Sequence, residues 1–167
     1  MGEAIELMTT SADQTRRLAA SVAGLLRPGD VVALAGDLGA GKTTFVQGAA
    51  SALGVEGAVV SPTFTLMREY AGDIDVVHVD VYRLDRIHDV ADLGFDEALE
   101  RGGVVFVEWG DAIEALLPPS RLIVRLTVPE GDDLALERRL VAVECVGPAW
   151  TSRVSALRAA TSEWKAA

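Results

Sequence analysis

The chain of 167 residues is long enough to close one hydrophobic core, and a hydrophobic fraction of 50% with a mean hydropathy of +0.27 excludes a disordered polypeptide. A formal net charge of −10, from 15 basic and 25 acidic residues, argues against a protein that binds free nucleic acid by itself. The chain has no apolar run near the ~18 residues of a membrane span, no basic residue before its first apolar segment and a single cysteine, so we expect a cytoplasmic protein without an internal disulfide.

The first predicted elements, in chain order, are a strand, a helix and a second strand. Residues 5–7 alternate in polarity, which predicts a short edge strand. A helix over residues 12–26 follows, because Ser11 and Gln14 form a capping box ahead of a helical apolar pattern. The continuous apolar run 31–35 is typical of a strand that is buried on both faces of a sheet.

The rest of the chain alternates between helical and strand patterns. The predicted elements are a helix at 42–53, two strands at 64–70 and 75–82 that form a hairpin, helical pieces within 89–100, a strand at 104–107, a helix at 111–117, two antiparallel strands at 122–128 and 137–145, and a final helix at 150–163. We therefore predict one domain over residues 1–167. Its fold class is α/β, a three-layer domain whose central sheet is mixed, parallel in the middle with antiparallel hairpins added.

The segment between the strand at 31–35 and the following helix matches the phosphate-loop pattern G-x-x-x-x-G-K-S/T in full. In such a loop the backbone N–H groups and the N-terminus of the helix face the phosphates of a nucleotide. Lys42 is expected to bridge the β- and γ-phosphates of ATP, and the Thr43 hydroxyl to ligate magnesium. The strand and helix on either side favour a nucleotide site over an ordinary glycine turn, so the predicted α/β fold is a three-layer P-loop NTPase-like domain. The predicted contacts are Gly36, Asp37, Leu38, Gly39, Ala40, Gly41, Lys42, Thr43 and Thr44.

Two features of the composition sharpen this prediction. The chain has only two lysines, Lys42 and Lys165, against 13 arginines (15 − 2). One of these two rare lysines lies inside the loop, where a compact ammonium reaches between phosphates in a way that a planar guanidinium does not match. The chain also has no asparagine, which disfavours GTPases that recognise guanine through an Asn-Lys-x-Asp loop.

Two carboxylates follow apolar strand patterns, as expected of the acid that holds magnesium in P-loop enzymes. Asp80 ends the run 76–79, and Glu108 ends the run 104–107. A carboxylate at the end of a buried strand needs a cation or hydrogen-bond donors, because burial of an unpaired charge is costly. An ordinary salt bridge, for instance between Asp80 and Arg83, is the alternative. Glu108 is the better candidate for contacting magnesium or polarising the attacking water, and Lys42 completes the catalytic candidates.

Three further residues lie beside these candidates. Thr63 belongs to a Ser-Pro-Thr-Phe segment in the region where P-loop NTPases carry loops that sense the γ-phosphate, although a plain proline turn explains the same residues. Trp109 follows Glu108, and core packing is its default explanation. His78, flanked by valines, is interpreted as a packed residue rather than a ligand.

Taken together, these segments resemble the TsaE family of bacterial ATPases, which are needed to make threonylcarbamoyladenosine on tRNA. The matching stretches are GDLGAGKTTF (36–45), SPTFTL (61–66), HVDVYRL (78–84), DLGFDEAL (92–99) and VEW (107–109). They occur in the order and at the spacing of the family, and they span most of residues 30–110. The combination is far more specific than the phosphate loop alone.

The resemblance implies a mixed sheet flanked by helices, and weak ATP hydrolysis that becomes significant within a complex. The implied partners are TsaB and TsaD, with TsaD transferring the threonylcarbamoyl group to the adenosine beside the anticodon, so that tRNA is met only indirectly. By analogy, Thr43 and Glu108 hold magnesium, Asp80 and Trp109 belong to the functional site, and Thr63 lies in the switch-like loop. The family also implies contacts to the nucleotide base near the first helix and in the C-terminal part. The candidates there are Thr10, Arg139 and Arg153, in segments that match the family only loosely.

Two other functions stay open at this point. A small-molecule kinase uses the same loop to transfer the γ-phosphate, but such enzymes need an acceptor pocket and usually an arginine-bearing lid. The segment after the phosphate-loop helix instead predicts a hairpin, with no insertion of lid size. A scaffold that binds nucleotide without hydrolysing it is the second alternative.

Overall fold

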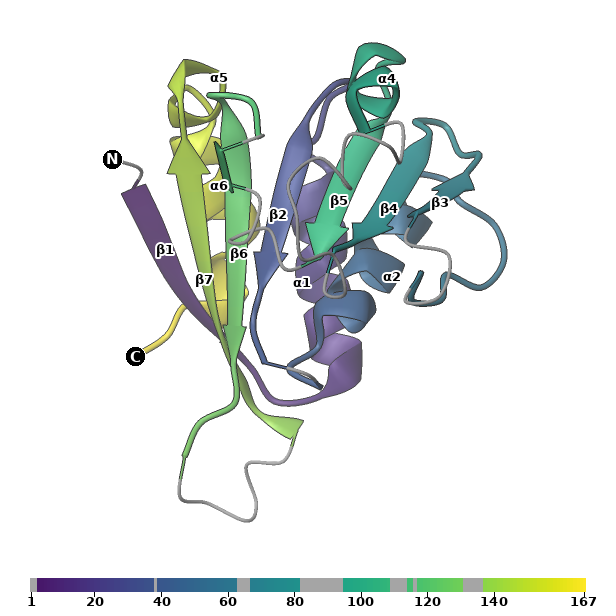
Figure 1. The fold of residues 1–167 in the computed structure, drawn as a ribbon. Helices are drawn as coiled ribbons and strands as arrows, with labels where there is room; N and C mark the ends of the chain where they lie inside the picture. Colours follow the sequence, from purple (N-terminus) through teal and green to yellow (C-terminus); the bar gives the residue numbers. More distant parts are fainter. Residues whose placement is uncertain are drawn as a thin grey trace.

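One sheet of seven strands, in the order β1-β7-β6-β2-β5-β4-β3, forms the centre of the molecule (Figure 1). This computed structural model describes residues 3–37, 39–62, 67–81, 95–108, 114–115, 117–130 and 137–167. The strands are β1 (Glu3–Thr9), β2 (Val31–Ala35), β3 (Met67–Tyr70), β4 (Val76–Asp80), β5 (Val104–Glu108), β6 (Arg121–Thr127) and β7 (Arg139–Val146). The helices are α1 (Ala12–Ala23), α2 (Lys42–Ala52), α4 (Phe95–Glu100), α5 (Pro148–Thr151), α6 (Val154–Ala160) and the 3₁₀ turn η3 (Ser162–Trp164).

The sheet is mixed in the way the sequence predicts. Strands β4, β5, β2 and β6 are parallel neighbours in the middle. Strand β3 pairs antiparallel with β4 at one edge, and β7 and β1 add antiparallel to β6 at the other. Every residue of β2, β4 and β5 is buried, which explains why their sequences are apolar without alternation. Because parallel strands end together, β2, β4 and β5 bring their carboxyl ends to one side of the molecule.

Helices cover the two faces of the sheet, which gives the predicted three layers. The larger core joins one face to α1, α2, α5 and α6, and includes Leu18, Phe45, Phe106 and Trp150. Figure 1 shows α1 and α6 on that same side of the sheet. Helix α1 crosses α2 so closely that a Cβ at Gly48 would lie 2.2 Å from a backbone oxygen of α1. The smaller core, on the other face, is covered by α4 within the described part of the chain.

Two predicted helices differ from the structure. Helix α1 ends at Ala23 rather than at residue 26. The single helix predicted at 150–163 is wrong, because α5, α6 and η3 are separate pieces. The first break falls at Arg153, whose side chain turns inward to reach Asp30 and Leu25. The predicted helical residues 89–94 and most of 111–117 lie outside the described residues. In the part that is described, we find no helix with the length and apolarity that crossing a membrane requires.

Candidate functional site

The phosphate-loop sequence lies between the end of β2 and the start of α2, at the carboxyl end of the parallel strands. Its first and last glycines are sterically required. Gly36 has a φ of +149°, and a Cβ there would lie 2.5 Å from the carbonyl oxygen of Leu126. Gly41 is the N-cap of α2 with a left-handed φ of +109°, a conformation that favours glycine. The loop therefore joins the strand to the helix as the motif predicts; Leu38 lies outside the described residues.

Lys42 is buried at the first position of α2, with a side chain that folds back over the loop. Its Nζ donates to the carbonyl oxygens of Gly36 at 2.7 Å and Asp37 at 3.0 Å. Burial lowers the pKa of the Lys42 ammonium below its ordinary value of 10.5. Three carboxylates oppose that shift, in the order Glu108, Asp80 and Asp37. A buried ammonium held by carbonyl groups at the mouth of this loop is placed to exchange them for phosphate oxygens.

Thr43 and Glu108 meet across the start of α2 and the end of β5. The Thr43 hydroxyl donates to Glu108 Oε1 at 3.0 Å. Asp80 lies opposite Glu108 in the register of β4 and β5, and both carboxylates are almost fully buried. Hydroxyl and carboxylate oxygens are ligands that magnesium prefers. Among the described residues no three His, Cys, Asp or Glu side chains gather as a metal-binding group, so a magnesium ion here would need ligands from phosphates and water as well.

Lys42, Thr43 and Glu108 line a hollow of about 200 Å³ at the carboxyl end of the sheet, whereas Asp80 is not part of its lining. Its walls are Gly39, Gly41, Lys42, Thr43, Thr44, Ser61 and Glu108. Ser61 was not among the predicted site residues, although it opens the Ser-Pro-Thr-Phe segment. The chain just before Ser61 is fixed by Gln47, whose Nε2 donates to the Val59 carbonyl at 2.9 Å. Thr63 and Trp109 lie outside the described residues, so their predicted places are not tested.

Comparison with known proteins agrees with this geometry. The family model described as "Threonylcarbamoyl adenosine biosynthesis protein TsaE" matches residues 9–140. The chain belongs to the TsaE family. This confirms the resemblance inferred from the motifs between residues 30 and 110.

Members of the family are similar over most of the chain. The tRNA threonylcarbamoyladenosine biosynthesis protein TsaE of Bacillus subtilis is 44% identical over 126 residues, which are 75% of this chain and 78% of that protein. The protein of the same name from Streptomyces coelicolor is 44% identical over 147 residues, 85% of this chain and 98% of the relative. A crystal structure of YdiB from Bacillus subtilis superposes with a TM-score of 0.80 at 36% identity, over 95% of this chain and 97% of the other.

Arg139 on β7 contacts the phosphate loop. It is one of the three residues that were predicted to contact the nucleotide base in this TsaE family member. Its guanidinium donates to the carbonyl oxygens of Ala40 at 2.9 Å and Gly39 at 3.3 Å. A small hollow of about 90 Å³ opens beside it, lined by Ala12, Thr15, Gly41, Thr44, Glu137 and Arg139. Thr10 is exposed just before α1, where its backbone N–H donates to the Gln14 side chain. A contact of either residue with a nucleotide base stays a prediction.

Arg153 is not brought to the site. It lies near the amino end of β2, opposite the phosphate loop, and is 5% exposed. Its guanidinium forms a bidentate pair with Asp30, at 2.7 and 3.0 Å, and donates to the carbonyls of Leu25 and Ala149. The same group lies over the ring of Trp150, 3.8 Å from its centroid. These contacts make Arg153 part of the framework, because its polar atoms are already used within the protein.

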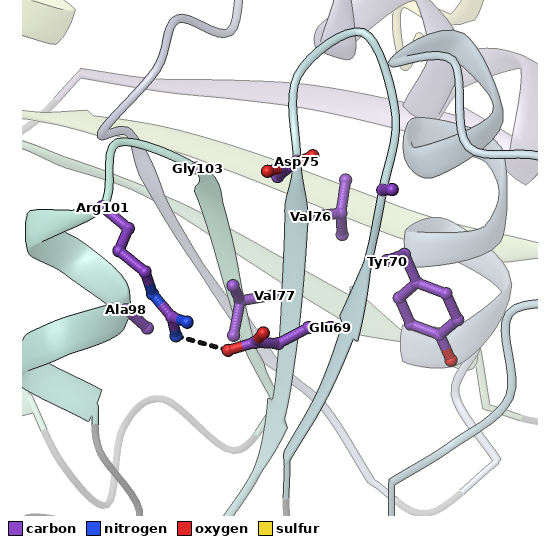
Figure 2. A pocket seen from close by; sticks show the side chains of 9 residues that line it. Glu69, Tyr70, Asp75, Val76, Val77, Ala98, Arg101 and Gly103 are labelled. Atoms are coloured by element: carbon purple, nitrogen blue, oxygen red, sulfur yellow. Dashed lines mark hydrogen bonds and ion pairs between the residues drawn. The ribbon is translucent and has the colours of Figure 1, made fainter.

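A second hollow, of about 190 Å³, lies at the amino ends of β4 and β5, far from the phosphate loop. Figure 2 shows Arg101 reaching from the end of α4 to Glu69 on β3, with Val77 and Ala98 beside this ion pair. The Tyr70 ring points away from this ion pair, and its hydroxyl contacts the backbone of Val60 instead. Since the phosphate-loop residues, Asp80 and Glu108 all lie at the carboxyl end, this second hollow is not part of the candidate nucleotide site.

Proposed function

We propose that this chain is a magnesium-dependent ATPase that supports threonylcarbamoyladenosine formation on tRNA. The observation that carries the proposal is the Thr43–Glu108 hydrogen bond, made beside a buried Lys42 at a complete phosphate loop. Together these groups offer a hydroxyl, a carboxylate and an ammonium around one hollow. P-loop NTPases place the same three groups around the β- and γ-phosphates.

Each residue then has a defined task. The backbone N–H groups at the N-terminus of α2 face the β-phosphate, while Lys42 exchanges the carbonyls of Gly36 and Asp37 for β- and γ-phosphate oxygens. Thr43 and Glu108 would hold magnesium, which supplies charge neutralisation of the two phosphates. Asp80, beside Glu108, helps to orient the attacking water. We also propose that the hollow next to Arg139 receives the base, with Thr10 at its rim.

The biological role is inferred from family membership. The curated relatives from Bacillus subtilis and Streptomyces coelicolor are named tRNA threonylcarbamoyladenosine biosynthesis proteins. We propose the same pathway for this chain, in the cytoplasm, with TsaD and TsaB as partners. A net charge of −10 makes direct binding of tRNA unfavourable, so the chain would act on the tRNA through these partners. ATP-dependent change of shape within the complex would support its turnover.

Hydrolysis is tested by Glu108→Gln, with Glu97→Gln on an exposed face of α4 as the matched control. The amide keeps the size of the side chain but removes the charge that organises magnesium and water. We expect the Glu108 variant to bind ATP and to lose turnover in the presence of TsaB and TsaD, measured as phosphate release. Equal hydrolysis by the variant and the parent would remove Glu108 from the mechanism. ATP binding by a parent chain that never hydrolyses would favour the scaffold.

The pathway is tested by reconstitution of tRNA modification with TsaB, TsaD and the adenylate-forming enzyme under multiple-turnover conditions. We expect modified tRNA to accumulate beyond one equivalent of TsaD only when this chain and ATP are both present. Phosphorylation of a metabolite by the isolated chain would point to the kinase alternative. Tight, salt-sensitive binding of tRNA by the isolated chain would contradict an indirect role.

A further inference from the structure

His78 is a fully buried polar side chain in the middle of β4, next to the proposed nucleotide site. Its Nε2 lies 3.0 Å from Glu108 Oε2. Within the described part of the chain neither Nδ1 nor Nε2 makes a well-aligned hydrogen bond, so the contact with Glu108 is close but not in line. An imidazole always carries at least one N–H, and a buried N–H without an acceptor is costly. Glu108 Oε2 is therefore the acceptor towards which this N–H can turn.

The fold explains why His78 lies under Glu108. In the register of β4 and β5, His78 is opposite Phe106 and Asp80 is opposite Glu108. Alternate residues of a strand share a face, so His78 and Asp80 point to the same side, together with Phe106 and Glu108. Phe106 belongs to the core that includes α2, so this is the side on which Thr43 lies. His78 thus lies on the strand next to Glu108, two residues before the position opposite it and on the same face of the sheet.

The two oxygens of Glu108 then have different neighbours. Oε1 accepts from the Thr43 hydroxyl at 3.0 Å, and Oε2 faces His78 Nε2. A carboxylate that is held at one oxygen only can rotate, whereas one that is held at both presents a fixed direction to a metal ion. Hydrogen bonds of this kind often tighten only when the substrate complex has formed.

We propose that His78 is a positioning residue, which donates its Nε2–H to Glu108 Oε2 and so fixes the carboxylate that holds magnesium. The inference rests on the proposed function, because it assumes that Glu108 is a magnesium ligand. Partners of metal-ligating carboxylates orient them, and loss of such a partner lowers metal affinity by roughly 10- to 100-fold. Sequence alone does not reveal this role, since a histidine among valines looks like any packed residue.

The test uses two substitutions of His78 and one neighbouring control. His78→Phe keeps a ring of similar size but removes both nitrogens, while His78→Gln keeps an N–H donor. Phe106→Leu alters packing at the cross-strand neighbour, which is equally buried and has no polar atom. For each protein we would measure the magnesium concentration that half-saturates binding of a fluorescent ATP analogue, the affinity for that analogue in EDTA, and the thermal unfolding midpoint in EDTA.

We expect His78→Phe to need roughly 10- to 100-fold more magnesium with an unchanged affinity in EDTA, and His78→Gln to recover most of the difference. Phe106→Leu should lower the unfolding midpoint without changing the magnesium requirement. The inference is overturned if His78→Phe and the parent need the same magnesium concentration, or if Phe106→Leu shifts that concentration as much. A parent chain whose nucleotide binding ignores magnesium would instead contradict the proposed function.

A second measurement needs no substitution of His78 and decides the matter if His78→Phe does not fold. The chain has only two histidines, so its imidazole ¹⁵N spectrum is simple, and a His88→Gln variant assigns the signals. A protonated Nε2 on His78 supports donation to Glu108. The tautomer with its proton on Nδ1 overturns it, because Nε2 would then have no hydrogen to give.

Discussion

The two ends of the parallel strands each hold a buried cation, and the cations are satisfied differently. At the amino end, the guanidinium of Arg153 forms a bidentate ion pair with Asp30 and donates to two backbone carbonyl groups. At the carboxyl end, Lys42 contacts two carbonyls of its own loop. Three carboxylates, those of Glu108, Asp80 and Asp37, act on this one ammonium.

This difference between the two cations distinguishes a structural ion pair from a candidate functional site. One cation faces one carboxylate at the amino end, so charge there is balanced within the protein. At the carboxyl end, the carboxylates of Glu108 and Asp80 act on the ammonium of Lys42, and the guanidinium of Arg139 contacts the same loop, so charged groups of both signs gather where the loop opens. Burial of charge is therefore not by itself a sign of a functional site. What distinguishes the site is that Lys42 and Glu108 border a hollow, whereas Arg153 and Asp30 are paired with each other.

The largest effect on stability is expected at the amino end. Arg153→Ala leaves Asp30, which is largely buried, without its cation, and breaking a buried pair typically costs about 3–5 kcal/mol. Chemical denaturation should therefore show a loss of that order in the free energy of unfolding. Nucleotide affinity of the folded fraction should stay unchanged, because the pair lies away from the loop. A stable variant with weakened ATP binding would instead support the original prediction that Arg153 contacts the nucleotide.

The next largest effect is expected for Lys42→Ala. Hydrogen bonds to charged groups contribute about 1.5–3 kcal/mol each, so we expect the affinity for ATP to fall roughly 10- to 150-fold. The loss of stability should be smaller than for Arg153→Ala, because the hydrogen bonds of Lys42 to Gly36 and Asp37 join neighbouring parts of one loop. Lys42→Arg keeps the charge but has a broad planar group, and we expect it to restore little of the affinity. Isothermal titration with ATP measures both variants; unchanged binding by Lys42→Ala would contradict the assignment of the loop.

The sequence predicts the phosphate-loop end of the molecule better than the opposite end, for a physical reason. The phosphate-loop motif is a local pattern, because Gly36, Gly41 and Lys42 lie within eight consecutive residues. The strand before it and the helix after it are also recognisable in the sequence. The apolar runs of β2, β4 and β5 likewise report burial directly. The mixed direction of the sheet follows from these runs and from the hairpin patterns, whereas the order of its seven strands was not predicted and comes from the structure.

What the sequence could not predict depends on contacts between distant residues. The break in the predicted C-terminal helix at Arg153 arises because its side chain reaches Asp30, 123 residues away. The places of Ser61 and His78 depend on the register of strands and on the path of a loop, which no local pattern encodes. For the same reason Arg139 and Arg153 looked equivalent in sequence, although they lie at opposite ends of β2.

Arg139 tests whether a residue at the carboxyl end supports the loop or the ligand. Arg139→Ala removes two hydrogen bonds to loop carbonyls, and we expect ATP affinity to fall by about 1–1.5 kcal/mol, roughly 5- to 10-fold. Its exposed neighbour serves as the control, because Arg138→Ala removes the same charge from the same strand end. Comparing ATP with inorganic tripolyphosphate separates the two roles. Equal losses indicate support of the loop, whereas a loss confined to ATP indicates contact with the base.

The smallest effect is expected for the ion pair that closes the second hollow. Arg101 and Glu69 have side chains that are 55% and 48% exposed, and exposed pairs contribute about 0–1 kcal/mol. A double-mutant cycle with Arg101→Ala and Glu69→Ala should give a coupling energy in that range, which falls as salt is added. Neither substitution should change ATP affinity, because the pair lies at the amino ends of β4 and β5. A coupling energy near the 3–5 kcal/mol expected for Arg153 would mean that exposure does not decide the strength of pairs at this end.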